Sequence, residues 1–320
     1  MERSQLLHLA GRVVTEIEKA IIGKRKAIEL AFIGLLCGGH VLIEDIPGVG
    51  KTTLAKALAR TLGGTFCRLQ FTPDLLPSDV TGVNVFNQRT GQFDFRPGPV
   101  FHNVLLADEI NRGSPKTQAS LLECMEEFQV TLDGVTRPVP SPFLVIATEN
   151  PIEYQGTYPL PEAQLDRFLL RVSIGYPTQA EELVILDSQA LRHPLETVEQ
   201  VLAPQEALAL RQAVKETYLD PAVKHYAVEV VRRTRTHPAV QLGASPRGSL
   251  GLARSSRARA VLEGRDYVTP DDVKYVAPAV LAHRLLLREE PSIPGRGQEE
   301  VIQEILGQVP VPVARTFARA

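Results

Sequence analysis

Residues 44–53 read Glu44-Asp45-Ile46-Pro47-Gly48-Val49-Gly50-Lys51-Thr52-Thr53. An apolar run precedes this stretch at residues 40–44, and leucines at four-residue spacing follow it at 54, 58 and 62. Such a run is typical of a buried strand, and such spacing of a helix. Glycines between them let the backbone turn its N–H groups toward a phosphate chain, and the helix N-terminus favours the same anion. The sequence therefore predicts a phosphate-binding loop, the P-loop, at residues 47–53.

Two side chains of this loop carry the chemistry of nucleotide binding. Lys51 is placed to reach the β- and γ-phosphates, and the hydroxyl of Thr52 is placed to ligate Mg²⁺. The full pattern, G-x-x-x-x-G-K-[ST], has glycine where this chain has Asp45, so the match is incomplete. A glycine-rich turn between strand and helix, with an incidental lysine, is the alternative interpretation.

A pair of acids follows a later apolar run, where residues 104–107 lead into Asp108-Glu109. The carboxyl ends of parallel strands form the ligand edge of such sheets, so we expect both acids beside the P-loop. Asp108 would hold Mg²⁺, and Glu109 would orient or deprotonate the attacking water. A kinase needs no such glutamate, so the pair favours a hydrolase, and the lack of an N-K-x-D element favours ATP over GTP. An acidic pair that merely caps a strand is the alternative.

The rest of the first half predicts an α/β domain. Apolar runs at residues 65–71, 143–148 and 168–172 are nearly continuous, as in parallel strands buried on both faces. Two hairpins are predicted between them, at residues 85–95 and 130–139, and Asp133-Gly134 is a favoured hairpin turn. We expect a central parallel sheet flanked by helices, with both hairpins projecting from it.

The second half has the pattern of helices. Thr178 and Glu181 form a capping box, and prolines follow the N-cap residues Asp220, Ser245 and Thr269. The predicted organisation is an α/β nucleotide-binding domain at residues 1–176, followed by a smaller all-α domain at residues 177–320.

The composition excludes several other classes of protein. The chain has 320 residues and a formal net charge of −2, so no overall charge favours binding to nucleic acid or acidic lipid. Charged residues interrupt its apolar segments, so neither a signal peptide nor a membrane span is expected. The three cysteines, Cys37, Cys67 and Cys124, are far apart, which favours buried thiols in a reducing cytoplasm over disulfides or a zinc site.

On these residues, the chain resembles the MoxR family of AAA+ ATPases, and it is also similar to magnesium chelatase ATPase subunits. The resemblance is carried by the P-loop, the acidic pair and five further segments, and it spans nearly the whole chain. Those segments are residues 21–29 (IIGKRKAIE), 115–127 (PKTQASLLECMEE), 145–151 (VIATENP), 160–168 (LPEAQLDRF) and 243–248 (GASPRG). Family members often have glutamine where this chain has Glu149.

The resemblance implies roles for positions that the chemistry alone leaves open. Asn150 matches sensor 1, which contacts the γ-phosphate or the attacking water; an ordinary Asn-Pro turn is the alternative. Arg167 matches the arginine finger lent to a neighbouring subunit, and an ion pair with a nearby carboxylate is the alternative. Arg247 matches sensor 2 in a lid helix, with a solvated arginine as the alternative. Ile22 and Gly23 match the segment beside the adenine.

The resemblance also implies a function. ATP would be hydrolysed with Mg²⁺ at subunit interfaces of a homo-oligomeric ring, expected to be a hexamer, which remodels or matures a client protein complex. Some such systems insert metal cofactors and work with a partner that carries a von Willebrand factor A domain. Two alternatives stay open: a nucleic-acid motor, for which Arg232, Arg233 and Arg235 are one basic group and Arg254, Arg257 and Arg259 another, and a nucleotide-gated assembly switch with little turnover.

Overall fold

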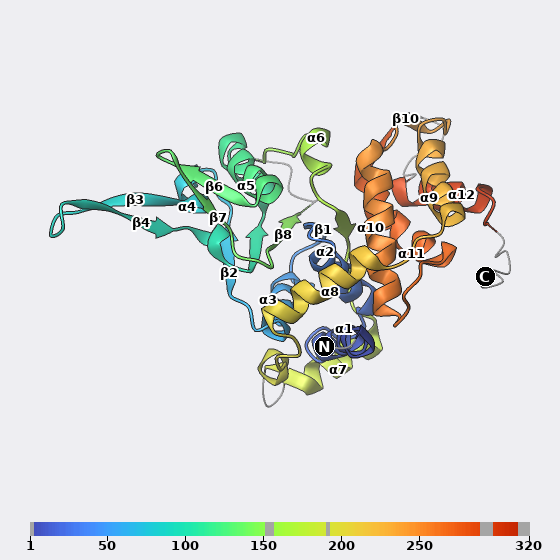
Figure 1. The fold of residues 1–320 in the computed structure, drawn as a ribbon, viewed down its shortest axis with the longest axis horizontal. Helices are drawn as coiled ribbons and strands as arrows, with labels where there is room; N and C mark the ends of the chain where they lie inside the picture. The colour runs from blue at the N-terminus through green and yellow to red at the C-terminus, as the bar shows by residue number, and fades with distance from the viewer. Residues whose placement is uncertain (1–2, 151–156, 190–192, 289–296, 313–320) are drawn as a thin grey trace. The chain divides into compact units, whose positions relative to one another are not determined.

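The computed structural model describes residues 3–150, 157–189, 193–288 and 297–312 (Figure 1). The chain forms two compact units, one that ends at Gln212 and one that begins at Ala213. The sequence predicted this division after Tyr176, before α7 (Gln179–Gln189) and α8 (Pro204–Glu216). Most of this region belongs to the first unit because its side chains bond there: Arg211 Nε, for example, donates to the carbonyl of Leu35 at 2.7 Å.

A five-stranded parallel sheet forms the centre of the first unit, as predicted. Its strand order is β2-β5-β8-β1-β9, and every neighbouring pair is parallel. The strands are β2 (Phe66–Gln70), β5 (Val104–Asp108), β8 (Leu144–Glu149), β1 (Val41–Glu44) and β9 (Leu170–Val172). The apolar residues of β5 and β8 are buried, which explains why their sequences do not alternate with polar residues.

Helices cover the sheet and bury its apolar side chains. The core on one face joins Leu105 and Val145 of the sheet to Leu121 of α5 (Pro115–Glu127). The remaining helices of this unit are α1 (Arg3–Glu18), α2 (Arg25–Leu36), α3 (Lys51–Thr61), α4 (Pro77–Thr81) and α6 (Glu162–Leu165), with short 3₁₀ turns at Pro99–Phe101, Ile110–Arg112 and Pro194–Thr197. Helix α3 begins directly at Lys51, so the lysine lies at the helix N-terminus.

Both predicted hairpins are present. The first pairs β3 (Gly82–Asn87) with β4 (Gln92–Pro97), and Figure 1 shows it reaching away from the sheet. The second pairs β6 (Gln129–Leu132) with β7 (Val135–Pro138), and its turn residues Asp133 and Gly134 have positive φ as expected. The hairpins touch each other, because Asn84 Nδ2 donates to Asp133 Oδ2 at 2.5 Å.

The second unit is mainly helical. Its helices are α9 (Pro221–Thr234), α10 (Pro246–Leu262), α11 (Pro270–Leu281) and α12 (Gln298–Gln308), with a 3₁₀ turn at Ala282–Arg284. The predicted caps are confirmed, since the side chains of Asp220, Ser245 and Thr269 each accept a backbone N–H of the helix that follows. The structure adds a small antiparallel pair, β10 (Val240–Leu242) with β11 (Leu286–Leu287), whose strands are too short to give a sequence signal. Within the described part of the chain, no helix is long and apolar enough to cross a bilayer.

Candidate active site

The P-loop has the backbone geometry that its glycines allow. Gly48 and Gly50 have φ angles of 85° and 95°, a region that residues with a side chain adopt only with strain. In this arrangement Lys51 Nζ donates to the main-chain carbonyl of Asp45 at 2.6 Å. Burial lowers the pKa of Lys51 from its usual value, and the carboxylates of Asp45, Asp108 and Glu109 oppose that shift. The lysine is therefore a partly desolvated cation at the N-terminus of α3, which is suited to an anionic ligand.

A pocket of about 360 Å³ lies over this loop. It brings together most of the residues expected to act on a nucleotide. Its lining consists of Pro47, Gly48, Gly50, Lys51, Thr52, Arg68, Asp108, Glu109 and Asn150. Five of the six P-loop residues at positions 47–52, all but Val49, therefore meet the acidic pair and Asn150 at one place, although more than a hundred positions separate the first from the last.

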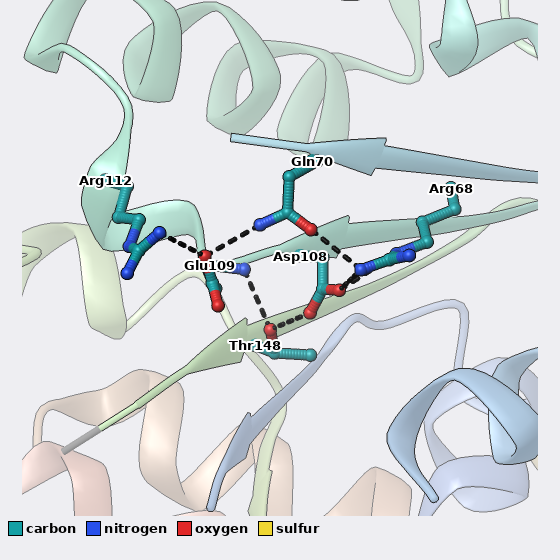
Figure 2. A network of polar contacts seen from close by, with 6 residues as sticks. All are labelled: Arg68, Gln70, Asp108, Glu109, Arg112 and Thr148. Carbon is teal, nitrogen blue, oxygen red and sulfur yellow. Dashed lines mark hydrogen bonds and ion pairs between the residues drawn. The ribbon is translucent and has the colours of Figure 1, made fainter. Parts of the chain in front are cut away.

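The carboxylate of Asp108 is held from two sides (Figure 2). Its Oδ2 accepts from the Nε and a terminal nitrogen of Arg68, at 2.9 and 2.6 Å. Its Oδ1 accepts from the hydroxyl of Thr148 at 2.6 Å. Since Arg68 is on β2 and Thr148 on β8, the strands on either side of β5 fix this acid in one orientation.

Glu109 is fixed as firmly as its neighbour. Its backbone has a φ of 55°, which is uncommon for a residue with a side chain, and its N–H donates to Thr148 Oγ1 at 2.9 Å. Its Oε2 accepts from Gln70 Nε2 at 2.7 Å and lies 3.1 Å from a terminal nitrogen of Arg112 (Figure 2). The single hydroxyl of Thr148 therefore positions both members of the acidic pair.

Sequence reasoning missed four residues of this network: Arg68, Gln70, Arg112 and Thr148. A signal existed for two of them, because Arg68 and Gln70 are polar residues at a spacing of two within an apolar strand and so share one face. Their proximity to the acids depends on β2 pairing with β5, in a register that sets Gln70 opposite Asp108. That pairing could not be read from the spacing alone.

The residues assigned by resemblance lie in different places. Asn150 is buried and lines the pocket. Arg167 is absent from the lining, and its Nε lies 3.3 Å from Glu126 Oε2, so its carboxylate partner is on α5. Arg247 is in the first turn of α10, in the second unit. Near the segment of Ile22 and Gly23, it is the preceding Ile21 that approaches the P-loop, where its side chain packs against Gly50.

A second acidic pair lies at the same edge of the sheet. Glu44 and Glu149 are opposite each other on β1 and β8, and Glu44 pairs with Arg171 at 2.9 Å. Glu149 has a buried oxygen with no hydrogen-bond partner. Burial and the charge of Glu44 raise the pKa of Glu149 to about 7, although Arg171 opposes the shift. Ionisation of Glu149 therefore works against folding.

We predict that Glu149→Gln stabilises the protein above neutral pH. The folded pKa lies above the unfolded one, so the stability tied to the protonated acid is lost as pH rises from about 4.5 to about 7. The gain should be small at pH 4.5 and reach at most about 3 kcal/mol at pH 8. Urea unfolding at both pH values measures it, with exposed Glu182→Gln as the matched control. An equal effect of Glu149→Gln at both pH values would contradict the assignment.

Comparisons with known proteins identify the family of the chain. The model of the ATPase family associated with various cellular activities (AAA) matches residues 40–170, and the AAA lid domain matches residues 232–305. Chaperone MoxR1 of Mycobacterium tuberculosis is 43% identical over 96% of this chain and 83% of its own. The uncharacterized protein YeaC of Bacillus subtilis is 52% identical over 97% of each chain.

The fold comparison gives the same result. A solved structure from Cytophaga hutchinsonii, described as an ATPase, superposes with a TM-score of 0.90 at 38% identity and covers 98% of each chain. Magnesium chelatase subunits are more distant relatives. An AAA domain with its lid, matched over nearly full length by MoxR proteins, leaves one assignment: the chain belongs to the MoxR family of AAA+ ATPases.

Proposed function

We propose that the chain hydrolyses ATP in the pocket over the P-loop and uses the energy to remodel a client protein complex. One observation carries the proposal: Lys51, Thr52, Asp108, Glu109 and Asn150 line a single pocket. A phosphate-binding loop alone would serve many nucleotide enzymes. The glutamate beside the magnesium-binding aspartate is what a hydrolase needs to direct water at the γ-phosphate.

The residues present fit Mg²⁺ as the metal. Thr52 and Asp108 supply a hydroxyl and a carboxylate on the same pocket wall, and Mg²⁺ usually takes one or two protein carboxylates together with phosphate oxygens. In the described ranges, no three His, Cys, Asp or Glu side chains gather to hold a metal, so the magnesium ligands of the protein would be the hydroxyl and the single carboxylate named above. When bound, the ion would neutralise charge that develops on the transferred phosphate.

The network around the acids supports the roles proposed for them. Lys51 would exchange the carbonyl of Asp45 for phosphate oxygens. Glu109 would direct the attacking water, with Gln70 and Arg112 holding its carboxylate in place. Asn150 would contact the same water or the γ-phosphate. The carboxylates of Asp108 and Glu109 are held in place before the substrate binds, which is how a site stabilises a transition state at least cost.

We further propose that the active unit is a ring, with six subunits as the expected number. Arg167 is separate from its own pocket and pairs with Glu126 at 3.3 Å across a partly exposed surface. A pair so exposed contributes little stability, so Arg167 can exchange its partner for the phosphate of a neighbouring subunit. Arg247, in the first turn of α10, would contact the nucleotide from the lid.

We predict complementation between two inactive variants. Glu109→Gln and Arg167→Ala should each lose ATPase activity, and Arg167→Ala by about 10³-fold or more if it is an arginine finger. Mixed rings should regain part of the activity, because some interfaces combine an intact Glu109 with an intact Arg167. Phosphate release under multiple turnover measures it, with Arg89→Ala as the control for loss of an exposed arginine.

Two outcomes would contradict this scheme. One is the failure of mixed assemblies to regain any activity, provided that both variants are folded and assemble. The other is an unchanged ATP affinity in Lys51→Ala, since Lys51 is assigned to the phosphates of the nucleotide. A chain that binds ATP and assembles but hardly turns it over would instead match the assembly switch.

The first hairpin is proposed to contact the client. Phe86 and Phe93 face each other across β3 and β4 with ring centroids 5.3 Å apart, and they are 52% and 71% exposed. Exposed aromatic pairs are unusual on a water-facing hairpin and often mark an interaction site. The hairpin projects from the sheet while its base is fixed by Arg137, which stacks 4.1 Å above the ring of Phe95.

We predict that Phe86→Ser with Phe93→Ser separates ATP hydrolysis from client binding. ATPase activity should stay at the wild-type level, because neither ring lines the pocket. Client proteins that co-purify with the ATP-trapped Glu109→Gln protein should be lost when the two serines are added, as measured by quantitative mass spectrometry. Val135→Ser, which removes an exposed apolar residue from the second hairpin, is the matched control. An unchanged client profile would contradict the proposed contact.

Nucleic-acid binding receives less support. Two of the arginines that suggested it form pairs within their own helices, Arg233 with Glu229 and Arg259 with Glu263. Arg235 Nε donates to the carbonyl of Ala244. Carboxylates therefore offset part of the positive charge of both groups, and the net charge of −2 favours no binding to nucleic acid.

A further inference from the structure

Asp45 occupies the position where the P-loop pattern has glycine, and its side chain is almost fully buried. Its Oδ2 accepts from the N–H groups of Ile174 and Gly175, at 2.6 and 2.7 Å, and from the hydroxyl of Ser173 at 3.2 Å. Its Oδ1 accepts from the N–H of Ile46 at 2.9 Å. A carboxylate therefore ties the start of the P-loop to the chain that leaves β9.

The main chain of the same residue bonds to the catalytic lysine. The carbonyl of Asp45 accepts from Lys51 Nζ at 2.6 Å, while its N–H donates to the carbonyl of Glu149 at 3.2 Å. The bonds of the Asp45 carboxylate to residues 173–175 are called the clamp here. A ligand that binds Lys51 Nζ in place of the Asp45 carbonyl changes the hydrogen bonding of the residue that makes the clamp. Asp45 thus contacts both Lys51, through its main-chain carbonyl, and residues 173–175, through its carboxylate.

The chain after this clamp also contacts the segment beside the expected adenine site. Lys24 Nζ donates to the carbonyl of Tyr176 at 2.7 Å and lies 3.9 Å from Glu181 Oε2. The carboxylate of Glu181 packs against Gly23 so closely that a Cβ on that glycine would lie 1.8 Å from Oε1. Residues 173–181 therefore touch the nucleotide-binding elements at two separate points.

We propose that Asp45 is a positioning residue that transmits engagement of Lys51 by a triphosphate to residues 173–181. This inference rests on the proposed binding of ATP in the pocket. Glycine at position 45 would leave the buried N–H of Ile174 and the partly buried N–H of Gly175 without their acceptor, and an unmade buried hydrogen bond is costly. With aspartate at this position, binding of a triphosphate to Lys51 would move the P-loop and the segment leading into α7 together.

The absence of tryptophan from the chain allows a direct test. Tyr176 is 74% exposed, so Tyr176→Trp places a single fluorophore next to the clamp. In a Glu109→Gln background that prevents turnover, ATP with Mg²⁺ should change its emission. Adding Asp45→Asn, which replaces one of the two acceptor oxygens by a donor, should diminish that change while calorimetry still detects ATP binding. Asp271→Asn, which alters an exposed aspartate, should leave both signals intact.

A milder variant keeps the test decisive if Asp45→Asn fails to fold. Ser173→Ala removes one exposed partner of the clamp and should reduce the emission change without abolishing it. An undiminished response in either folded variant, or ATP binding with no emission change in the reporter protein itself, would overturn this inference. Failure of the reporter protein to bind ATP in calorimetry would count instead against the proposed function.

Discussion

The parallel pairing of β5 with β8 is the constraint on which the site depends. It sets Ala107 opposite Ala147, so the next residues, Asp108 and Thr148, meet at the carboxyl edge of the sheet. The resulting 2.6 Å hydrogen bond fixes the aspartate, and the same hydroxyl accepts the N–H of Glu109. A shift of one residue in this pairing would move Thr148 away from Asp108, and both acids would lose their hydrogen bonds to its hydroxyl.

Several carboxylates lie at one edge of the sheet, where their charges would repel each other without nearby cations. Three of them are paired with an arginine. Arg68 pairs with Asp108, Arg112 with Glu109, and Arg171 with Glu44. Glu149 is the exception, because burial outweighs the influence of Arg171 and raises its pKa to about 7. A glutamine at this position would avoid that cost.

Much of the fold could be predicted from sequence because its signals are local. The P-loop, the buried strands, the Asp133-Gly134 turn and the capped helices each depend on residues close together in the chain. The partners of the acids could not be predicted in this way. The contacts of Arg68 and Thr148 with Asp108 arise from strand order, and the clamp of Asp45 on Gly175 joins residues 130 positions apart. The division after Gln212 likewise depends on long-range contacts, not on composition.

The incomplete P-loop pattern illustrates the same lesson. From the sequence, Asp45 was a departure that weakened the match. In the structure Asp45 is buried, and both of its carboxylate oxygens accept hydrogen bonds. The departure therefore has a structural role that matching this position to the P-loop pattern does not reveal.

We propose that the P-loop and the acidic pair act on one triphosphate. A crystal structure with Mg²⁺ and a non-hydrolysable ATP analogue would locate that ligand. We expect the β- and γ-phosphates at Lys51, and the metal between Thr52 and Asp108. A nucleotide bound away from Lys51, or a metal bound without Asp108, would contradict it.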